Sequence, residues 1–350
     1  MSVKYAEQTC KSVLGDIGIL NTRSWTKHTF DPYENCEFNC VYCDTATKQY
    51  CNSHSLSVPV YAKVNAPERL KKELACLKRK GVVNLGLAMD PYQQAEKKFR
   101  LTQQILMVLR DNKCPFAIGT KSDLILRDLD LIVETAKKSR GCVSLSITTL
   151  DENLAKLIEP NAPPPKKRLE VVNKFASAGV TTGVWISPIL PYITDTEENI
   201  TRIIEASIEN GAMYFLGGAL DMRNAISFHH FLEQHFPSLI PKYDKLYKTK
   251  DNTRTHYPTE IYLYTLYKKF ISICKNYGVE KYMPHFHTRK QAILFYVRNY
   301  FRFSGESFSE LLPLLNYLSP TQELLQTVQL RCGKGELGKS FLKAFHYFPH

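Results

Sequence analysis

The sequence predicts an α/β fold, a full or partial parallel (β/α) barrel of about six βα units with a C-terminal helical extension. Three observations predict this class. Short apolar runs alternate with amphipathic stretches, the alternation repeats at roughly 30 residues, as in a βα unit, and it stops after about Leu220. An open doubly wound sheet is the alternative architecture for the same pattern.

Six segments have the features of strands in a parallel sheet. One precedes Cys36, and the other five are the continuous apolar runs that a strand covered on both faces requires. These five runs are Val82–Ala88, Pro115–Gly119, Val143–Ile147, Thr181–Ser187 and Ala212–Leu216.

Amphipathic helices are expected between the strands, because apolar residues recur there at helical spacing. The first of them has a proline at its start, and Gly179 and Gly211 follow two others, as is typical of helix ends. The expected helices are Pro67–Lys80, Leu101–Arg110, Leu129–Lys138, Lys166–Ala178 and Thr196–Asn210.

The same pattern divides the chain into an N-terminal segment at residues 1–25, the barrel at 26–220 and a helical region at 221–350. The helical region is rich in Tyr, Phe, Lys and His, as in Tyr257–Asn276 and Ile293–Phe301. Its aromatic stripes are more typical of a packed core than of base-stacking platforms. We expect this region to be the substrate-binding part.

Composition excludes several classes of protein. With 44% hydrophobic and 23% charged residues in 350, the chain has ample material for a core, which argues against disorder. The N-terminus MSVKYAEQTC has no apolar signal core, so the ten cysteines indicate a reducing, cytoplasmic compartment. No apolar run is long enough to span a membrane. The net charge of +12 favours an anionic partner such as nucleic acid, or reflects a basic, solvated surface.

Three cysteines lie close together in DPYENCEFNCVYCD, where three residues separate Cys36 from Cys40 and two separate Cys40 from Cys43. In a reducing cell such thiolates form a soft-ligand site suited to iron-sulfur or zinc. A closed site would recruit a fourth ligand, for which the candidates are Cys51, His54 and His28. In an open site, three thiolates would hold three irons of a cubane, and the fourth iron would take an exogenous ligand.

The cysteine spacing, with the aromatic Tyr42 before the last cysteine, resembles that of the radical S-adenosylmethionine (SAM) superfamily. The resemblance implies a [4Fe-4S] cluster on Cys36, Cys40 and Cys43, with SAM bound to its unique iron. It also implies reductive cleavage of SAM to a 5′-deoxyadenosyl radical, with a flavodoxin or ferredoxin as electron donor. In this chemistry the cofactors react and the protein positions them.

Further segments resemble the spore photoproduct lyase-like family, often described as DNA repair photolyase-like. The similarity covers roughly residues 10 to 285 and implies a lyase-like enzyme of DNA repair. It rests on CKSVL, DPYENCEFNCVYC, AMDPYQQAE, GTKSDLILRDLDL, SLSITTLDENLAKLIEPNAPPPKKRL and SPILPYITD.

Polar motifs follow the predicted strands, where the active sites of parallel barrels lie. Asp90 and Tyr92 follow the run at Val82, and Lys121 and Ser122 follow the run at Pro115. In the next strand, the hydroxyls of Ser144, Ser146 and Thr148 share one face by the two-residue period. A dry barrel interior would leave them unsatisfied, which indicates a bound ligand.

The family resemblance implies roles for these residues. Lys121 would pair with the methionine carboxylate of SAM, Ser146 would hydrogen-bond nearby and Asp90 would receive the amino group, while Tyr42 and Ser122 would complete the cofactor site. Asp90 is equally typical of a turn before proline.

The sequence departs from the lyase pattern at the hydrogen-return step. That family places a cysteine on the strand before AMDPY, whereas Leu87, Ala88 and Met89 stand here. Tyr92 and Tyr192 are the candidates for a substitute redox residue. The alternative function is a non-catalytic zinc or iron-sulfur binding module that recognises nucleic acid.

Overall fold

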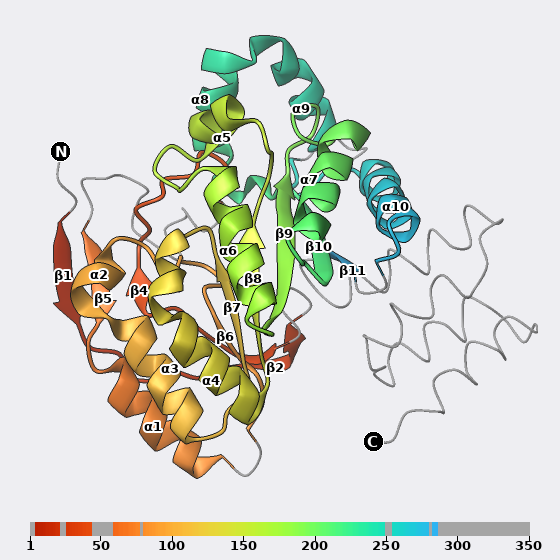
Figure 1. The fold of residues 1–350 in the computed structure, drawn as a ribbon. Helices are drawn as coiled ribbons and strands as arrows, with labels where there is room; N and C mark the ends of the chain where they lie inside the picture. Colours follow the sequence, from red (N-terminus) through yellow and green to blue (C-terminus); the bar gives the residue numbers. More distant parts are fainter. Residues whose placement is uncertain are drawn as a thin grey trace, which may run out of the picture. The chain divides into compact units, whose positions relative to one another are not determined.

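The computed structural model describes residues 4–21, 26–43, 59–77, 80–248, 254–279 and 282–285. Its main sheet has eight strands in the order β11-β10-β9-β8-β7-β6-β3-β2 (Figure 1). All neighbouring strands pair in parallel except β2 and β3, which are antiparallel. The strands are β2 Gly15–Asn21, β3 Thr26–Phe30, β6 Val83–Leu85, β7 Phe116–Thr120, β8 Gly141–Ser146, β9 Thr181–Ile189, β10 Tyr214–Ala219 and β11 Tyr282–His285.

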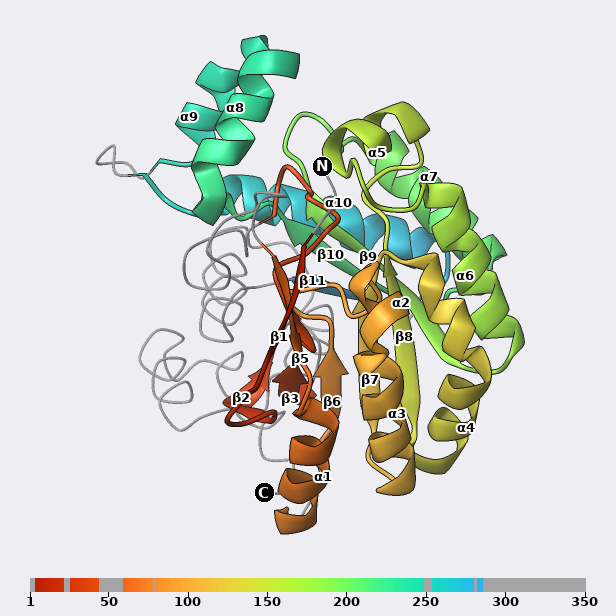
Figure 2. The ribbon, with the colours of Figure 1, turned by 90° about the vertical axis from the view of Figure 1, so that its left-hand side faces the viewer.

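Helices connect successive parallel strands and lie along one face of the sheet (Figures 1 and 2). They are α1 Ala66–Cys76, α3 Leu101–Asp111, α4 Leu129–Ser139, α6 Pro165–Ser177, α7 Glu197–Glu209 and α10 Glu260–Asn276. Since β2 and β11 are the two edges of this sheet in the described residues, the fold is a partial barrel. All six predicted parallel strands and the five helices between them are present, so the α/β fold class is confirmed.

Two features were not expected from the sequence. The strand β11 follows α10 and extends the parallel sheet beyond β10, whereas only helices were expected after residue 220. Near the N-terminus, a second sheet joins β1 (Tyr5–Gln8), β5 (Val60–Lys63) and β4 (Tyr33–Glu34). It supports the segment that carries the cysteines, because β4 ends directly before that segment.

Short helices complete the fold at the carboxyl edge of the sheet. They are α2 Ala95–Phe99, α5 Glu152–Ile158, α8 Ala225–His235 and α9 Ile240–Leu246, with the 3₁₀ turns η1 Asp123–Asp128, η2 Met222–Asn224 and η3 Pro237–Leu239. The helices α5, α8 and α9 pack around one apolar cluster that includes Tyr42 of the cysteine segment. The expected helix at Ile293–Phe301 lies outside the described residues. None of the described helices is long and apolar enough to cross a membrane.

The two faces of the sheet differ in chemistry. The helix-covered face carries fully buried aliphatic and aromatic residues such as Leu85, Ile118 and Phe215. Each such side chain contributes roughly 1.5–3 kcal/mol by leaving water. On the opposite face, the rings of Trp185 and Tyr214 lie where a Cβ on Gly119 and Gly183 would stand, so these glycines make room for the rings. Polar residues concentrate on this second face and at the carboxyl edge.

Candidate cofactor site

The cysteine loop, residues 35–43, follows β4 at the carboxyl edge of the sheet. Asn35 and Asn39 take the left-handed backbone conformation, with φ of 70° and 50°, which asparagine tolerates better than most residues. The backbone N–H of Cys36 donates to Asn35 Oδ1 at 2.9 Å, and the N–H of Cys43 donates to the Cys40 carbonyl at 3.1 Å. These tight turns keep the three thiols on one short loop.

The three thiols are only partly exposed, and each interacts electrostatically with the next. Burial raises the pKa of Cys36 well above its ordinary value, and the Asp90 carboxylate and the Cys40 thiolate raise it further. Burial also raises the pKa of Cys40 to about 12, although Lys121 opposes the shift. Thiols of this kind are stable as thiolates once a metal replaces the proton, so the donor set fits a soft metal.

No three His, Cys, Asp or Glu side chains in the described ranges converge as ligands of a single metal ion. A cubane cluster does not require its protein ligands to converge on one metal ion, because its three protein thiolates bind three different irons. The sulfur set therefore fits an iron-sulfur cluster, in which the three thiolates would bind three irons.

A buried polar network lies beneath the cysteine loop. The Tyr42 hydroxyl donates to Glu159 Oε1, and the Thr148 hydroxyl donates to the same atom at 2.8 Å. The other Glu159 oxygen pairs with Arg168, and the side chains of this ion pair are 2% and 1% exposed. Burial would raise the pKa of Glu159, but the positive charges of Arg168 and Lys121 outweigh it and lower the pKa. The network fixes the aromatic ring of the cysteine motif.

Lys121 and Asp90 lie together beside this loop, as the sequence predicts. The Lys121 ammonium lies 5.7 Å from the centroid of the Tyr42 ring and interacts with the charge of Cys40. The Asp90 carboxylate accepts hydrogen bonds from the Thr120 hydroxyl at 2.6 Å, from the Lys121 N–H at 2.7 Å and from the Tyr92 N–H at 2.9 Å. Asp90 therefore links the ends of β6 and β7 and also forms a turn before Pro91.

The predicted polar face of β8 has protein partners that the sequence did not reveal. The Ser144 hydroxyl is 2.6 Å from the Tyr214 hydroxyl, and Thr148 donates to Glu159. Of these hydroxyls, Ser146 is therefore the one that still indicates a ligand on this face; it is 7% exposed at the end of β8. Ser122 caps η1, because its hydroxyl oxygen accepts from the Leu124 N–H at 3.2 Å.

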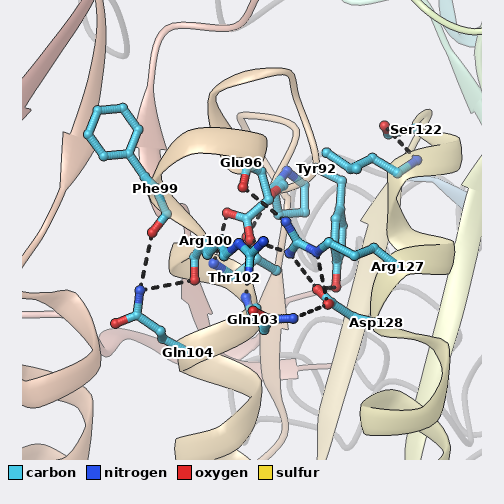
Figure 3. Close-up of polar contacts among 12 residues, drawn as sticks. Tyr92, Glu96, Phe99, Arg100, Thr102, Gln103, Gln104, Ser122, Arg127 and Asp128 are labelled. Carbon is cyan, nitrogen blue, oxygen red and sulfur yellow. Dashed lines mark hydrogen bonds and ion pairs between the residues drawn. The ribbon is translucent and has the colours of Figure 1, made fainter.

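Tyr92 is completely buried and takes part in a network of charged side chains (Figure 3). Its hydroxyl donates to Asp128 Oδ2 at 3.2 Å. Arg127 pairs with both Asp128 and Glu96, at 2.6 and 2.7 Å, and so ties η1 to α2. The structure thus gives the Tyr92 hydroxyl a partner away from the cysteine loop, and its catalytic role stays a prediction.

Tyr192 lies in the turn after β9, at the carboxyl edge of the sheet. Its side chain is 42% exposed, and its backbone is left-handed with φ of 63°. The Tyr192 N–H donates to Asp195 Oδ1 at 2.9 Å, and its ring makes an edge contact with Tyr243 at 6.0 Å. Lys242 lies 5.4 Å from the ring centroid. The turn presents a fixed aromatic ring beside a positive charge.

Comparison with known proteins identifies this arrangement. The sequence pattern of the radical SAM superfamily matches residues 31–205, half of the chain, from just before the cysteine loop into α7. The chain belongs to the radical SAM superfamily. It is therefore a radical SAM enzyme, and membership implies that SAM and an iron-sulfur cluster are its cofactors.

Two relatives illustrate how far the sequence similarity extends. The chain is 29% identical over 253 residues to the uncharacterized protein Rv2578c of Mycobacterium tuberculosis. The aligned residues cover 70% of this chain and 74% of that protein. It is 32% identical over 212 residues to the uncharacterized protein MJ0683 of Methanocaldococcus jannaschii, and the aligned residues cover 60% of this chain and 77% of that protein.

Solved structures share the fold of this radical SAM enzyme. Spore photoproduct lyase complexed with dinucleoside spore photoproduct matches with a TM-score of 0.61 and 12% identity, over 79% of this chain and 80% of that chain. A spore photoproduct lyase mutant with bound AdoMet and dinucleoside spore photoproduct matches with a TM-score of 0.57 and 12% identity, over 75% and 77%. At this identity the likeness shows the fold alone.

Of the three candidates for a fourth protein ligand, His28 is the one that lies among the described residues. Cys51 and His54 lie outside the described residues. His28 is 3% exposed within β3, where it pairs in register with Val83. It lies two residues before the carboxyl end of that strand, whereas the cysteine loop follows β4.

Glu159 and Arg168 of this radical SAM site were not predicted from the sequence. A signal for Arg168 exists, because it shares the buried face of α6 with Val171, Val172 and Phe175 at helical spacing. A charged residue at such a position requires a buried partner. Nothing local to Glu159 indicates that it is this partner.

Proposed function

We propose that Cys36, Cys40 and Cys43 hold a [4Fe-4S] cluster and that the enzyme cleaves SAM reductively. When bound, the cluster supplies an electron that breaks the sulfonium bond and gives a 5′-deoxyadenosyl radical. The observation that carries the proposal is the gathering of Cys40, Lys121 and Asp90 at one edge of the sheet. Three thiolates, a cation and a carboxylate are the groups that an open cluster and a zwitterionic amino acid need.

Lys121 and Asp90 would bind the methionine part of SAM. The Lys121 ammonium would pair with the carboxylate, and Ser146 would donate a hydrogen bond nearby. A carboxylate has about four acceptor positions, and the three bonds to Asp90 leave one for the amino group of SAM. The Tyr42 ring, fixed by Glu159, would form one wall of the site. Ser122 would act indirectly, since it caps the turn that follows Lys121.

A nucleic acid is the substrate class that we propose, in a lyase-like reaction of DNA repair. The net charge of +12, the exposed ring of Tyr192 beside Lys242 and the named ligand of the lyase structures support it. The segment Leu87–Met89 offers no thiol for a hydrogen-return step. We propose Tyr192 as the substitute, because it is exposed at the carboxyl edge of the sheet.

The electron donor that we propose is a flavodoxin or a ferredoxin, in the cytoplasm, where a reducing environment keeps the three thiols available for iron. Helices α8 and α9 pack on the apolar cluster that contains Tyr42, which supports our proposal that this helical region binds the substrate.

Anaerobic reconstitution with iron and sulfide tests the cofactor assignment. The wild-type enzyme is expected to bind about four irons and four sulfides per chain, with a brown absorbance that dithionite bleaches. The Cys40→Ala variant should lose most of this absorbance, while Cys114→Ala, which removes a fully buried thiol elsewhere, should keep it. One colourless zinc per chain in place of iron would refute the proposal and favour a non-catalytic zinc module.

A further inference from the structure

Two side-chain amides from different segments of the chain hydrogen-bond to the backbone of the cysteine loop. The first belongs to Gln93, which is fully buried in the segment after β6. Its Oε1 accepts the backbone N–H of Glu37 at 3.0 Å, and its Nε2 donates to the carbonyl of Asn35 at 3.0 Å. These two hydrogen bonds hold the backbone of the residues directly before and after Cys36.

Glu37 of the cysteine loop in turn hydrogen-bonds to the segment that contains Gln93. The Glu37 carboxylate accepts the backbone N–H of Ala95 at 2.8 Å and the hydroxyl of Tyr5 at 2.8 Å. The side chain of each segment thus bonds to the backbone of the other. Because Glu37 is 6% exposed, water competes little for these bonds.

The second amide belongs to Asn161, in the connection between α5 and α6. Its Nδ2 donates to the Glu37 carbonyl at 2.9 Å, and its backbone N–H donates to the Phe38 carbonyl at 3.4 Å. Nearby, the Val41 N–H donates to the Ile158 carbonyl at 3.0 Å. The connection between α5 and α6 therefore also holds the backbone between Cys36 and Cys40.

The conformation held in this way is one that a free loop would populate poorly. Asn35 and Asn39 are both left-handed, and such residues persist only where their surroundings hold them. Ligands that are held in place before metal binding lose less conformational entropy when the metal binds.

We propose that Gln93 and Asn161 are positioning residues that hold the cysteine loop in its cluster-binding conformation before the cluster is present. The inference rests on the proposed function, since it assumes that the three thiols bind a cluster. Neither amide would touch the cluster. Partners behind metal ligands typically change metal affinity by roughly 10- to 100-fold when they are removed.

The test compares Gln93→Ala and Asn161→Ala with Gln104→Ala in the full-length, reconstituted enzyme. Gln104 is a matched control, because its amide also donates to two carbonyls, those of Phe99 and Arg100, at 3.1 Å on an exposed surface (Figure 3). The readouts are the rate at which an iron chelator removes the cluster and the thermal midpoint of the metal-free protein.

Gln93→Ala and Asn161→Ala are expected to lose cluster iron about tenfold faster than wild type or more, whereas Gln104→Ala should match wild type. Gln93→Glu and Asn161→Asp replace only the amide nitrogen and keep the side-chain size. Both should accelerate iron loss in the same direction. The thermal midpoint should stay close to that of Gln104→Ala for Asn161→Asp, because residue 161 is exposed, whereas Gln93→Glu adds a buried carboxylate and should lower it.

Two outcomes would overturn the inference, and they are distinguishable. If wild type holds a cluster and all four variants retain iron as Gln104→Ala does, the amides do not position the loop, and the proposed function survives. If reconstituted wild type holds no cluster, the proposed function fails and this inference fails with it.

Discussion

Breaking the buried ion pair between Arg168 and Glu159 by removing the arginine is expected to cost the fold several kilocalories per mole. Arg168→Met keeps most of the side-chain length but removes the donors to the Pro163 carbonyl at 2.8 Å and the Ser146 carbonyl at 2.9 Å. It also leaves the Glu159 charge buried without its cation. Removing one partner of such a pair typically costs about 3–5 kcal/mol.

Urea unfolding of the metal-free protein measures this cost. Arg110→Met is the control, because Arg110 also forms ion pairs, in its case with Asp111 and Glu134, but on the surface. The surface variant should lose no more than about 1 kcal/mol. A free energy of unfolding for Arg168→Met within about 1 kcal/mol of that for Arg110→Met would refute the reasoning.

The effect of Arg168→Met should depend on pH. Since the folded state lowers the pKa of Glu159, ionised Glu159 stabilises the fold fully above the ordinary carboxyl pKa of about 4.3. This contribution is lost as the pH falls through the lowered pKa. The difference in unfolding free energy between wild type and Arg168→Met should therefore shrink below about pH 4, and a difference that grows there would contradict the assignment.

Three further predictions concern the site and its surroundings. Lys121→Met should weaken SAM binding by roughly tenfold or more without changing iron content, as equilibrium dialysis would show, and unchanged affinity would exclude the carboxylate contact. Tyr192→Ala should weaken binding of a fluorescent single-stranded oligonucleotide by about fivefold or more, whereas Tyr277→Ala, 41% exposed elsewhere, should not; equal effects would count against Tyr192. Gly119→Ala should lower stability by about 1–3 kcal/mol and shift Trp185 fluorescence, because its methyl group overlaps that ring; an unaltered spectrum would contradict the packing.

The strands could be predicted from the sequence where their burial is complete. Strands such as β7 are buried along their whole length, and complete burial produces a continuous apolar run. The strand β11 could not be predicted in this way. Among the described residues it pairs with β10 alone, and its sequence, YMPH, includes a proline that edge strands tolerate. The pairing of β1 with β5 joins segments about fifty residues apart, and such pairing leaves no local pattern.

The candidate site likewise contains residues that could be predicted from the sequence and residues that could not. The cysteines could be predicted because their chemistry depends on a spacing of a few residues. The positions of Asp90 and Lys121 followed from the rule that parallel strands bring their carboxyl ends together, and they are joined by a hydrogen bond. Gln93 and Asn161 could not be predicted, because their bonds to Glu37 cross 56 and 124 residues of sequence. The partner of the Ser144 hydroxyl could not be predicted from the sequence, since Tyr214 comes from a strand two positions away in the sheet.

Production of 5′-deoxyadenosine tests the central claim most directly. The reconstituted enzyme would be reduced with dithionite under anaerobic conditions and mixed with SAM, with Cys40→Ala as the control. We expect 5′-deoxyadenosine from the wild-type enzyme and none above background from the control. A wild-type enzyme with a full cluster that leaves SAM intact would contradict the claim that the cysteine loop, Lys121 and Asp90 form a site for reductive SAM cleavage.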